Sequence, residues 1–407
     1  MVKKMYFTAL ICCLILSSTG TAFAAKGTAN EELLRARELG KSVNAFAFDL
    51  YKEIAKEEKG NIFFSPLSIS MALALAYEGA AGETREEMRR VLHFKGNAGE
   101  QFRAYLDILN DTPKESGELL LATAVWPDVD LNISERYVDI LKKYYNCDVT
   151  IFDFSGSWHI TQAMNNWISG KTKGKIKHMV TAKDIEKECL MLGSAIYFNG
   201  GWEEKFNSKK TKGMPFFHTA KEVEEMLFMY QKGNIDYFEN VKLQSVRFNF
   251  KNGVFSYIVL LPRKQNDWMN IRLSQELFDE VLRGMKPSNV TIYLPKFKME
   301  SSYTLNATLQ NIGIKKAFKE YEADFSNISL TNAMPGKDTI LYYLSKIMHK
   351  AIFEINEDHV KAAAATSVSM EGLKILNKYI EFKADRPYVY IITDKRTGLI
   401  LFIGKKV

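Results

Sequence analysis

The chain has 407 residues, of which 46% are hydrophobic and 25% are charged, so it can bury a large core and has the composition of a globular protein. That balance excludes an intrinsically disordered chain. The formal net charge is +7, but the basic residues are scattered, and the two densest groups, residues 171–177 and 209–212, are better interpreted as solvated loops than as a patch for nucleic acid or heparin.

The N-terminal segment, residues 1–24, has the pattern of a secretory signal peptide. Two lysines precede an apolar run, Thr8–Leu16, which is too short to span a bilayer, and Ala22–Ala24 is a small-x-small cleavage site. We therefore expect residues 25–407 to form a single secreted domain, extracellular or periplasmic, that has no membrane anchor.

Cysteine usage is sparse outside this leader. Only Cys147 and Cys189 remain, and two cysteines do not make a disulfide framework. We predict two free, buried thiols. Pairing in an oxidising compartment stays open, because the sequence does not show the distance between them.

The first half of the chain is mostly helical in pattern. Apolar residues recur at helical spacing over Glu31–Glu57, and residues 61–64 read as a short buried strand. Ser65 can cap a helix that has Pro66 at its first position, where the missing N–H is not needed. This helix, Leu67–Tyr77, is apolar nearly all round and should be buried.

A capping-box pattern at residues 84–87 predicts the start of another helix. The second half is mostly strand in pattern, interrupted by helical patterns at Ser274–Leu282 and Leu305–Ile312. The expected strands are Ser245–Asn249, Phe255–Leu261, Val290–Leu294, Tyr379–Lys383 and Tyr388–Thr393. Strands and helices do not alternate regularly, so we expect an α+β fold with large mixed or antiparallel sheets in one domain.

Motifs for catalysis, metal binding and phosphate binding are missing from the sequence. It contains no Gly-x-Ser-x-Gly, His-Glu-x-x-His, phosphate-loop or Cys-x-x-Cys motif. Its six histidines do not cluster at ligand spacing. The sequence therefore supports neither an enzyme nor a metal or cofactor site.

One segment, Val360–Gly372, alternates with a period of two residues. One face carries Val360, Ala362, Ala364, Thr366, Val368 and Met370, and the other carries Lys361, Ala363, Ala365, Ser367, Ser369 and Glu371. This is the pattern of a half-buried strand, although the run of alanines has poor strand propensity. A surface helix is an equally good interpretation of the pattern alone, since alanine favours helix.

Six short motifs, in this order and spacing, resemble those of the serpin family along essentially all of the mature chain. They are residues 61–69 (NIFFSPLSI), 165–176 (NNWISGKTKGKI), 195–202 (AIYFNGGW), 294–297 (LPKF), 345–351 (SKIMHKA) and 385–388 (DRPY). The resemblance implies three β-sheets with about nine helices and an exposed reactive-centre loop at about 357–380.

The resemblance also implies a mechanism. A serine protease attacks the exposed loop as a substrate and becomes acylated at the scissile residue. The cut loop then inserts as a new strand in the main sheet and carries the tethered protease with it, so that the native state must be kinetically trapped. The implied partner is a serine protease held covalently by a monomeric inhibitor, with no nucleic acid and no cofactor involved.

Counting in the family's frame places the scissile bond sixteen residues after Glu357, at Leu373–Lys374. A leucine there suits a chymotrypsin-like, elastase-like or subtilisin-like target with an apolar pocket. A shorter loop template gives Leu376, and a cut after Lys374 would suit a trypsin-like target instead. The implied hinge comprises Glu357, His359, Val360, Lys361, Ala362, Ala363, Ala364, Ala365 and Thr366.

Further positions match the family singly. Ser65, Ser68, Ser194 and His349 match the shutter, a hydrogen-bonded cluster beneath the opening sheet, and Trp202, Lys296 and Glu357 match the breach, where the loop first enters.

Four positions depart from the family pattern. His359 replaces a usual glycine, Val360 a small hydroxyl residue, Lys361 a glutamate and Ser194 an asparagine. A stiffer hinge at His359 would favour the alternative function, that of a non-inhibitory serpin acting as a binding or chaperone protein.

Overall fold

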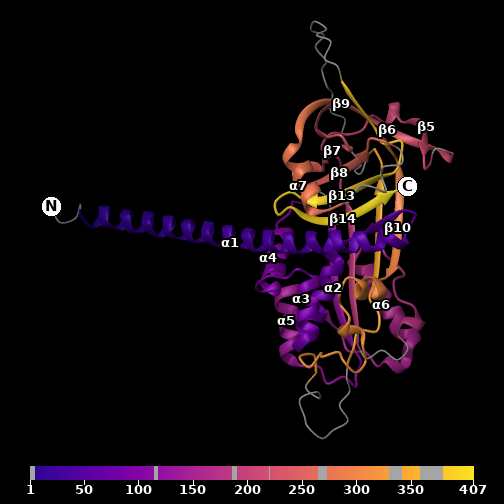
Figure 1. The fold of residues 1–407 in the computed structure, drawn as a ribbon. Coiled ribbons are helices and arrows are strands. Elements are labelled where there is room, and N and C mark those ends of the chain that lie inside the picture. The colour runs from indigo at the N-terminus through magenta and orange to yellow at the C-terminus, as the bar shows by residue number, and fades with distance from the viewer. Residues whose placement is uncertain are drawn as a thin grey trace.

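The computed structural model of the chain describes residues 5–113, 118–185, 190–219, 221–264, 273–329, 342–357 and 379–407 (Figure 1). The α-helices of these ranges are α1 (Met5–Glu57), α2 (Pro66–Gly79), α3 (Gly82–Val91), α4 (Ala98–Asn110), α5 (Glu135–Tyr145), α6 (Ser157–Lys171), α7 (Gln275–Gly284) and α8 (Asn306–Asn311). The strands are β1 (Ile62–Phe64), β2 (Glu118–Pro127), β3 (Asp148–Val149), β4 (Leu190–Asn199), β5 (Lys212–Phe217), β6 (Val223–Glu239), β7 (Leu243–Asn249), β8 (Phe255–Pro262), β9 (Lys286–Pro295), β10 (Phe297–Thr304), β11 (Met348–Ile355), β12 (Ile380–Lys383), β13 (Tyr388–Asp394) and β14 (Leu399–Lys406).

The strands form two sheets. One has five strands in the order β10-β11-β4-β2-β3. The other has the order β1-β14-β13-β8-β7-β6-β9-β12, with β5 paired to β6. The resemblance implied three sheets, but β6 is a continuous strand that pairs with β5 and β9 along most of its length and with β7 at its end, and so joins two of them.

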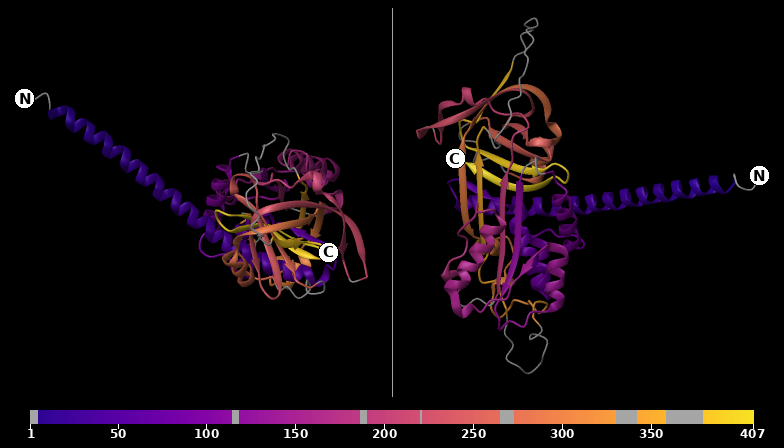
Figure 2. Two further views of the ribbon diagram at one scale, coloured as in Figure 1. Left: turned by 90° about the horizontal axis from the view of Figure 1, so that it is seen from above. Right: turned by 180° about the vertical axis from the view of Figure 1, so that it is seen from behind.

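The five-stranded sheet is covered on both faces. Alternate residues of β2 and β4, among them Trp126 and Ala195, pack against α6 in a small apolar cluster. The residues between them, such as Val125 and Ile196, belong to the main core that α2 and the second sheet share. The right view of Figure 2 shows long strands running down the molecule, with the C-terminal strands β13 and β14 across the upper half and most of the helices around the lower half.

Helix α2 follows from its local sequence, as predicted. The Ser65 hydroxyl accepts a hydrogen bond from the Ser68 N–H at 3.2 Å, and Pro66 occupies the first turn. Nearly every residue of α2 is buried, because the helix packs against β4, α1 and α5. The predicted helix over Glu31–Glu57 is confirmed as the second part of α1, and Figure 1 shows the first part extending away from the body.

The predicted capping box at residues 84–87 is wrong, since α3 already begins at Gly82. The polar side chains of that motif bond to a distant segment instead. The Thr84 hydroxyl accepts from the Asp324 N–H at 2.9 Å, and the Glu87 carboxylate accepts from the backbone of Lys315 and Lys316 at 2.7 Å each.

The α+β class is confirmed, with eight α-helices in the described ranges where the resemblance implied about nine. Sequence patterns missed β2 and β4, because these strands have apolar residues on both faces and lack the alternation of a half-buried strand. Over the residues described, no helix has the length and apolarity needed to cross a membrane. Cys147 is a buried free thiol, as predicted, and Cys189 lies outside the described residues.

Candidate functional site

Among the four long strands of the five-stranded sheet, β10, β11, β4 and β2, the seam between β4 and β11 has the fewest paired residues. These strands run parallel and share only two register pairs, Ala351–Ile196 and Ile352–Tyr197. On either side, β4 pairs with β2 over ten residues and β11 pairs with β10 over eight, both antiparallel. Few hydrogen bonds therefore have to break for the sheet to part between β4 and β11.

The shutter residues predicted from the sequence meet beneath this seam. His349 on β11 accepts a hydrogen bond from the Ser65 N–H through Nε2 at 3.0 Å. The Ser68 hydroxyl lies 3.0 Å from the hydroxyl of Ser194 on β4. The N-terminal end of α2 is therefore hydrogen-bonded to both strands of the seam.

Ser194 does not reproduce the reach of the asparagine that the family pattern has there. Its short side chain bonds to Ser68, and among the described residues no hydrogen bond joins it to His349. Within the described ranges, the cluster therefore consists of two bonded pairs, which the hydrogen bond between Ser65 and Ser68 at the helix cap connects.

His349 is neutral at physiological pH. It is 2% exposed, and burial lowers its pKa from 6.5 to about 3, because the charged imidazolium would lose its hydration. The Nε2 atom accepts the Ser65 N–H, so it carries no proton and the neutral ring has its proton on Nδ1.

The breach residues lie at the end of β11. The Trp202 indole N–H donates to the Asn356 carbonyl at 2.8 Å, and its ring stacks on Phe250 with centroids 4.8 Å apart. The Glu357 carboxylate accepts from Lys296 Nζ at 2.8 Å through one oxygen and from the Thr211 hydroxyl at 2.7 Å through the other. Asn356 and Glu357, the last described residues of this segment, are thus held by hydrogen bonds from Trp202, Lys296 and Thr211.

Glu357 is ionised despite being only 9% exposed. Burial opposes ionisation, but the hydrogen bonds from Lys296 and Thr211 outweigh it and hold the pKa of Glu357 below its usual range. Thr211 was missed by sequence reasoning, since its neighbours Lys209, Lys210 and Lys212 suggested only a solvated loop.

The remaining predicted residues lie outside the part of the chain that the structure describes. They are His359, Val360, Lys361, Ala362, Ala363, Ala364, Ala365 and Thr366 of the hinge and Leu373 and Lys374 of the scissile bond, together with Leu376. The chain is described again from Tyr379, and β12 then pairs in parallel with β9. After β12, the Arg386 guanidinium donates to the Pro262 carbonyl at 2.8 Å, which fixes this end of the segment to β8.

The comparison with known families agrees with this geometry. The model of the family described as serpin (serine protease inhibitor) matches residues 41–407. The chain belongs to the serpin family.

Serpins similar to this chain come from distant organisms. An uncharacterised serpin-like protein of Methanosarcina acetivorans is 33% identical, over 98% of this chain and 95% of its own. The leukocyte elastase inhibitor of Xenopus laevis is 32% identical, over 90% of this chain and 98% of its own. The crystal structure of Serpin48, described as a highly specific serpin of the insect Tenebrio molitor, superposes with a TM-score of 0.78 at 29% identity, covering 91% of this chain and 97% of that one.

Proposed function

We propose that this serpin is an irreversible, single-use inhibitor of serine proteases that traps the acylated protease by inserting its cut loop between β4 and β11. The observation that carries the proposal is the direction of the strands at the seam. A segment that leaves β11 at Glu357 and turns back into the seam runs antiparallel to β11, and because β4 is parallel to β11 it runs antiparallel to β4 as well. One added strand would thus replace a weak parallel seam by two antiparallel ladders.

The sequence of the segment suits this slot. Its inward face would carry only small or apolar side chains and one threonine, so insertion would bury no charge, while Lys361 and Glu371 would stay on the outer face. The relative named leukocyte elastase inhibitor supports an inhibitory role.

We assign the scissile bond to Leu373–Lys374 and the target to proteases with an apolar pocket, chymotrypsin-like, elastase-like or subtilisin-like. Cuts after Lys374 or Leu376 are the alternatives, and the first of them would change the target class to trypsin-like. We further propose that the protein is exported after removal of residues 1–24 and acts as a monomer.

The deciding experiment is a denaturing gel after mixing the mature protein with chymotrypsin, subtilisin and trypsin in turn. A covalent complex that survives the detergent supports inhibition, and mass spectrometry of the released peptide locates the cut. Cleaved serpin with free protease in every lane would instead support the non-inhibitory alternative, a binding or chaperone role.

A matched pair of variants tests the insertion step. Thr366→Arg puts a charge on the inward face and should convert the inhibitor into a substrate, because the guanidinium would have to be buried on insertion. Ser367→Arg puts the same charge on the outward face and should leave the complex intact. Equal effects of the two substitutions would contradict the proposed register of insertion.

A further inference from the structure

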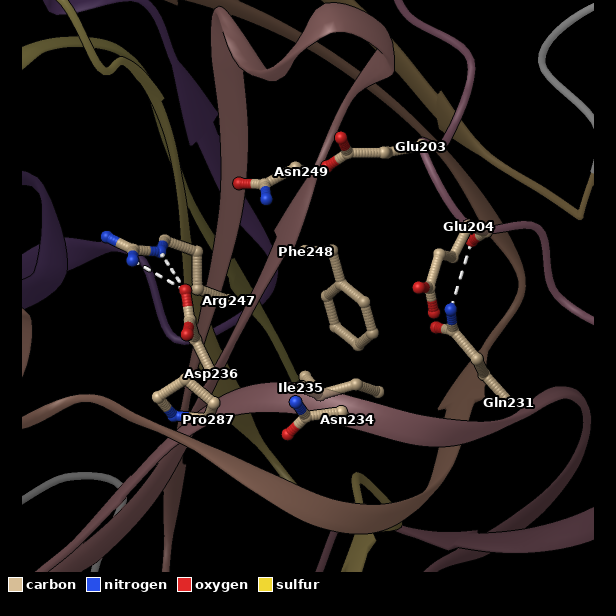
Figure 3. A pocket seen from close by; sticks show the side chains of 10 residues that line it. All are labelled: Glu203, Glu204, Gln231, Asn234, Ile235, Asp236, Arg247, Phe248, Asn249 and Pro287. Carbon is tan, nitrogen blue, oxygen red and sulfur yellow. Dashed lines mark hydrogen bonds and ion pairs between the residues drawn. The ribbon is translucent and has the colours of Figure 1, made fainter.

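A cavity of about 190 Å³ opens where β6 and β7 diverge (Figure 3). These strands pair from Glu239–Gln244 to Asp236–Arg247 and no further, after which β6 continues along β9. The loop that follows Trp202 spans the resulting fork. Its Glu203 N–H donates to the Asn249 carbonyl of β7 at 3.0 Å. On the β6 side, the Asn207 N–H donates to the Tyr230 carbonyl at 2.8 Å.

A buried amide oxygen without a partner lies in the wall of this cavity. Gln231 is only 6% exposed, and its Nε2 donates to the Glu204 backbone carbonyl at 3.0 Å. That bond sets the orientation of the amide, because the reverse orientation would bring two oxygens together. Among the residues that the structure describes, no donor then hydrogen-bonds to its Oε1, and a buried acceptor without a partner is costly.

The Glu204 carboxylate, which comes from the loop after Trp202, lies against the same face of β6 as this amide. Glu204 Oε2 lies 3.4 Å from the point that a Cβ of Gly233 would occupy, and Gly233 is two residues along the strand from Gln231. Figure 3 shows Gln231 and Glu204 on one side of the cavity, with the ion pair of Asp236 and Arg247 on the other.

The cavity therefore has an excess of hydrogen-bond acceptors and of negative charge. The carboxylates of Glu203 and Glu204 have no ion-pair partner in the described ranges, whereas Asp236 is neutralised by Arg247 at 2.5 Å. Lys395, whose charge is acted on by Glu203, donates to the Asn249 side-chain oxygen at 3.0 Å. The described residues include no group of three acidic, histidine or cysteine side chains that could hold a metal ion. A positively charged group that donates hydrogen bonds would match both the unpartnered amide oxygen and the unpaired carboxylates.

We propose that this fork binds a small organic cation that carries a primary ammonium or guanidinium group. The N–H groups of the cation donate to Gln231 Oε1 and to the Glu204 carboxylate, and its methylene chain lies against Phe248, Ile235 and Pro287, which supply the apolar part of the lining. The bound cation contacts the loop that follows Trp202 through Glu203 and Glu204.

The test is isothermal titration calorimetry of the full mature protein with agmatine, which carries one ammonium and one guanidinium group. We expect one site with a dissociation constant below about 1 mM. Tetramethylammonium has the charge but no N–H donors, and it should bind at least about tenfold more weakly. No heat of binding with agmatine up to 10 mM, or equal affinity for tetramethylammonium, would overturn the proposal, as would tighter binding of calcium chloride.

Two variants place the site within the fork. Glu204→Gln removes the charge from an exposed side chain, and Gln231→Leu removes the buried acceptor; each should weaken agmatine binding at least about tenfold. Glu222→Gln removes another exposed carboxylate, from the turn between β5 and β6, and serves as the matched control. Unchanged affinity in Glu204→Gln, a substitution at an exposed position, would exclude this site even if Gln231→Leu failed to fold.

Discussion

The neutral histidine of the shutter makes the native state sensitive to acid. The pKa of His349 is about 3 in the folded chain and about 6.5 in an unfolded one, so between these values the unfolded state binds one more proton. The contribution of His349 to the free energy of unfolding has its full value above pH 6.5 and is lost as the pH falls. Protonation would place an unsolvated charge at the seam and remove the acceptor of the Ser65 N–H.

The size of this effect follows from the two pKa values. The free energy of unfolding should fall by up to about 1.4 kcal/mol per pH unit inside the window, and by about 2 kcal/mol between pH 7 and pH 5. His349→Gln keeps a hydrogen-bond acceptor in the same place but cannot be protonated there. Its free energy of unfolding should therefore lack the pH dependence that comes from the histidine.

Urea unfolding at pH 7, 6 and 5, followed by tryptophan fluorescence, measures the difference. Carboxylates titrate alike in both proteins, so the difference in free energy of unfolding between wild type and His349→Gln isolates the histidine. Between pH 7 and pH 5 this difference should shift by about 2 kcal/mol in favour of the variant. His178→Gln, at an exposed histidine, is the control and should follow the wild type. Parallel pH profiles for wild type and His349→Gln would refute the reasoning.

Three further predictions concern the breach and the buried thiol. Lys296→Met leaves Glu357 without its cation and should lower the free energy of unfolding by about 1–2 kcal/mol. The control is Lys298→Met, at an exposed lysine of β10, and equal losses in the two variants would contradict a specific role for the ion pair. Trp202→Phe removes the indole donor to residue 356 and should cost about 1 kcal/mol in urea unfolding at neutral pH, and no change would show that this bond contributes nothing. Burial raises the pKa of Cys147 to about 12, so iodoacetamide at pH 8 should modify this thiol only in urea, as read by peptide mass spectrometry.

Local features of the fold could be predicted because neighbouring residues decide them. Ser65 caps α2 through a bond to Ser68, three residues away, and the apolar positions of Glu31–Glu57 recur at the helical period. The capping box at residues 84–87 failed for the opposite reason, since its side chains found partners more than 200 residues away.

Resemblance to the family predicted the residues of the candidate site one by one. It did not predict the hydrogen bonds between them. The resemblance identified Ser194, His349, Trp202, Lys296 and Glu357. It did not show that the Ser194 side chain bonds to Ser68 and does not extend to His349. Nor did it identify Thr211, which bonds to Glu357 across 146 positions of the chain. Such distances depend on how far each side chain reaches once the sheets are packed.

By itself, the amino-acid sequence determined the family, the buried helix beneath the sheet and the alternating segment after Glu357, because these depend on residue order and periodicity. Only the tertiary structure decided that β4 and β11 meet in a short parallel seam and that β6 joins two sheets. It also placed an unpartnered amide in the fork beside β7. These features arise where strands distant in sequence approach and diverge, and the free energy of packing the whole core, rather than any local preference, sets where that happens.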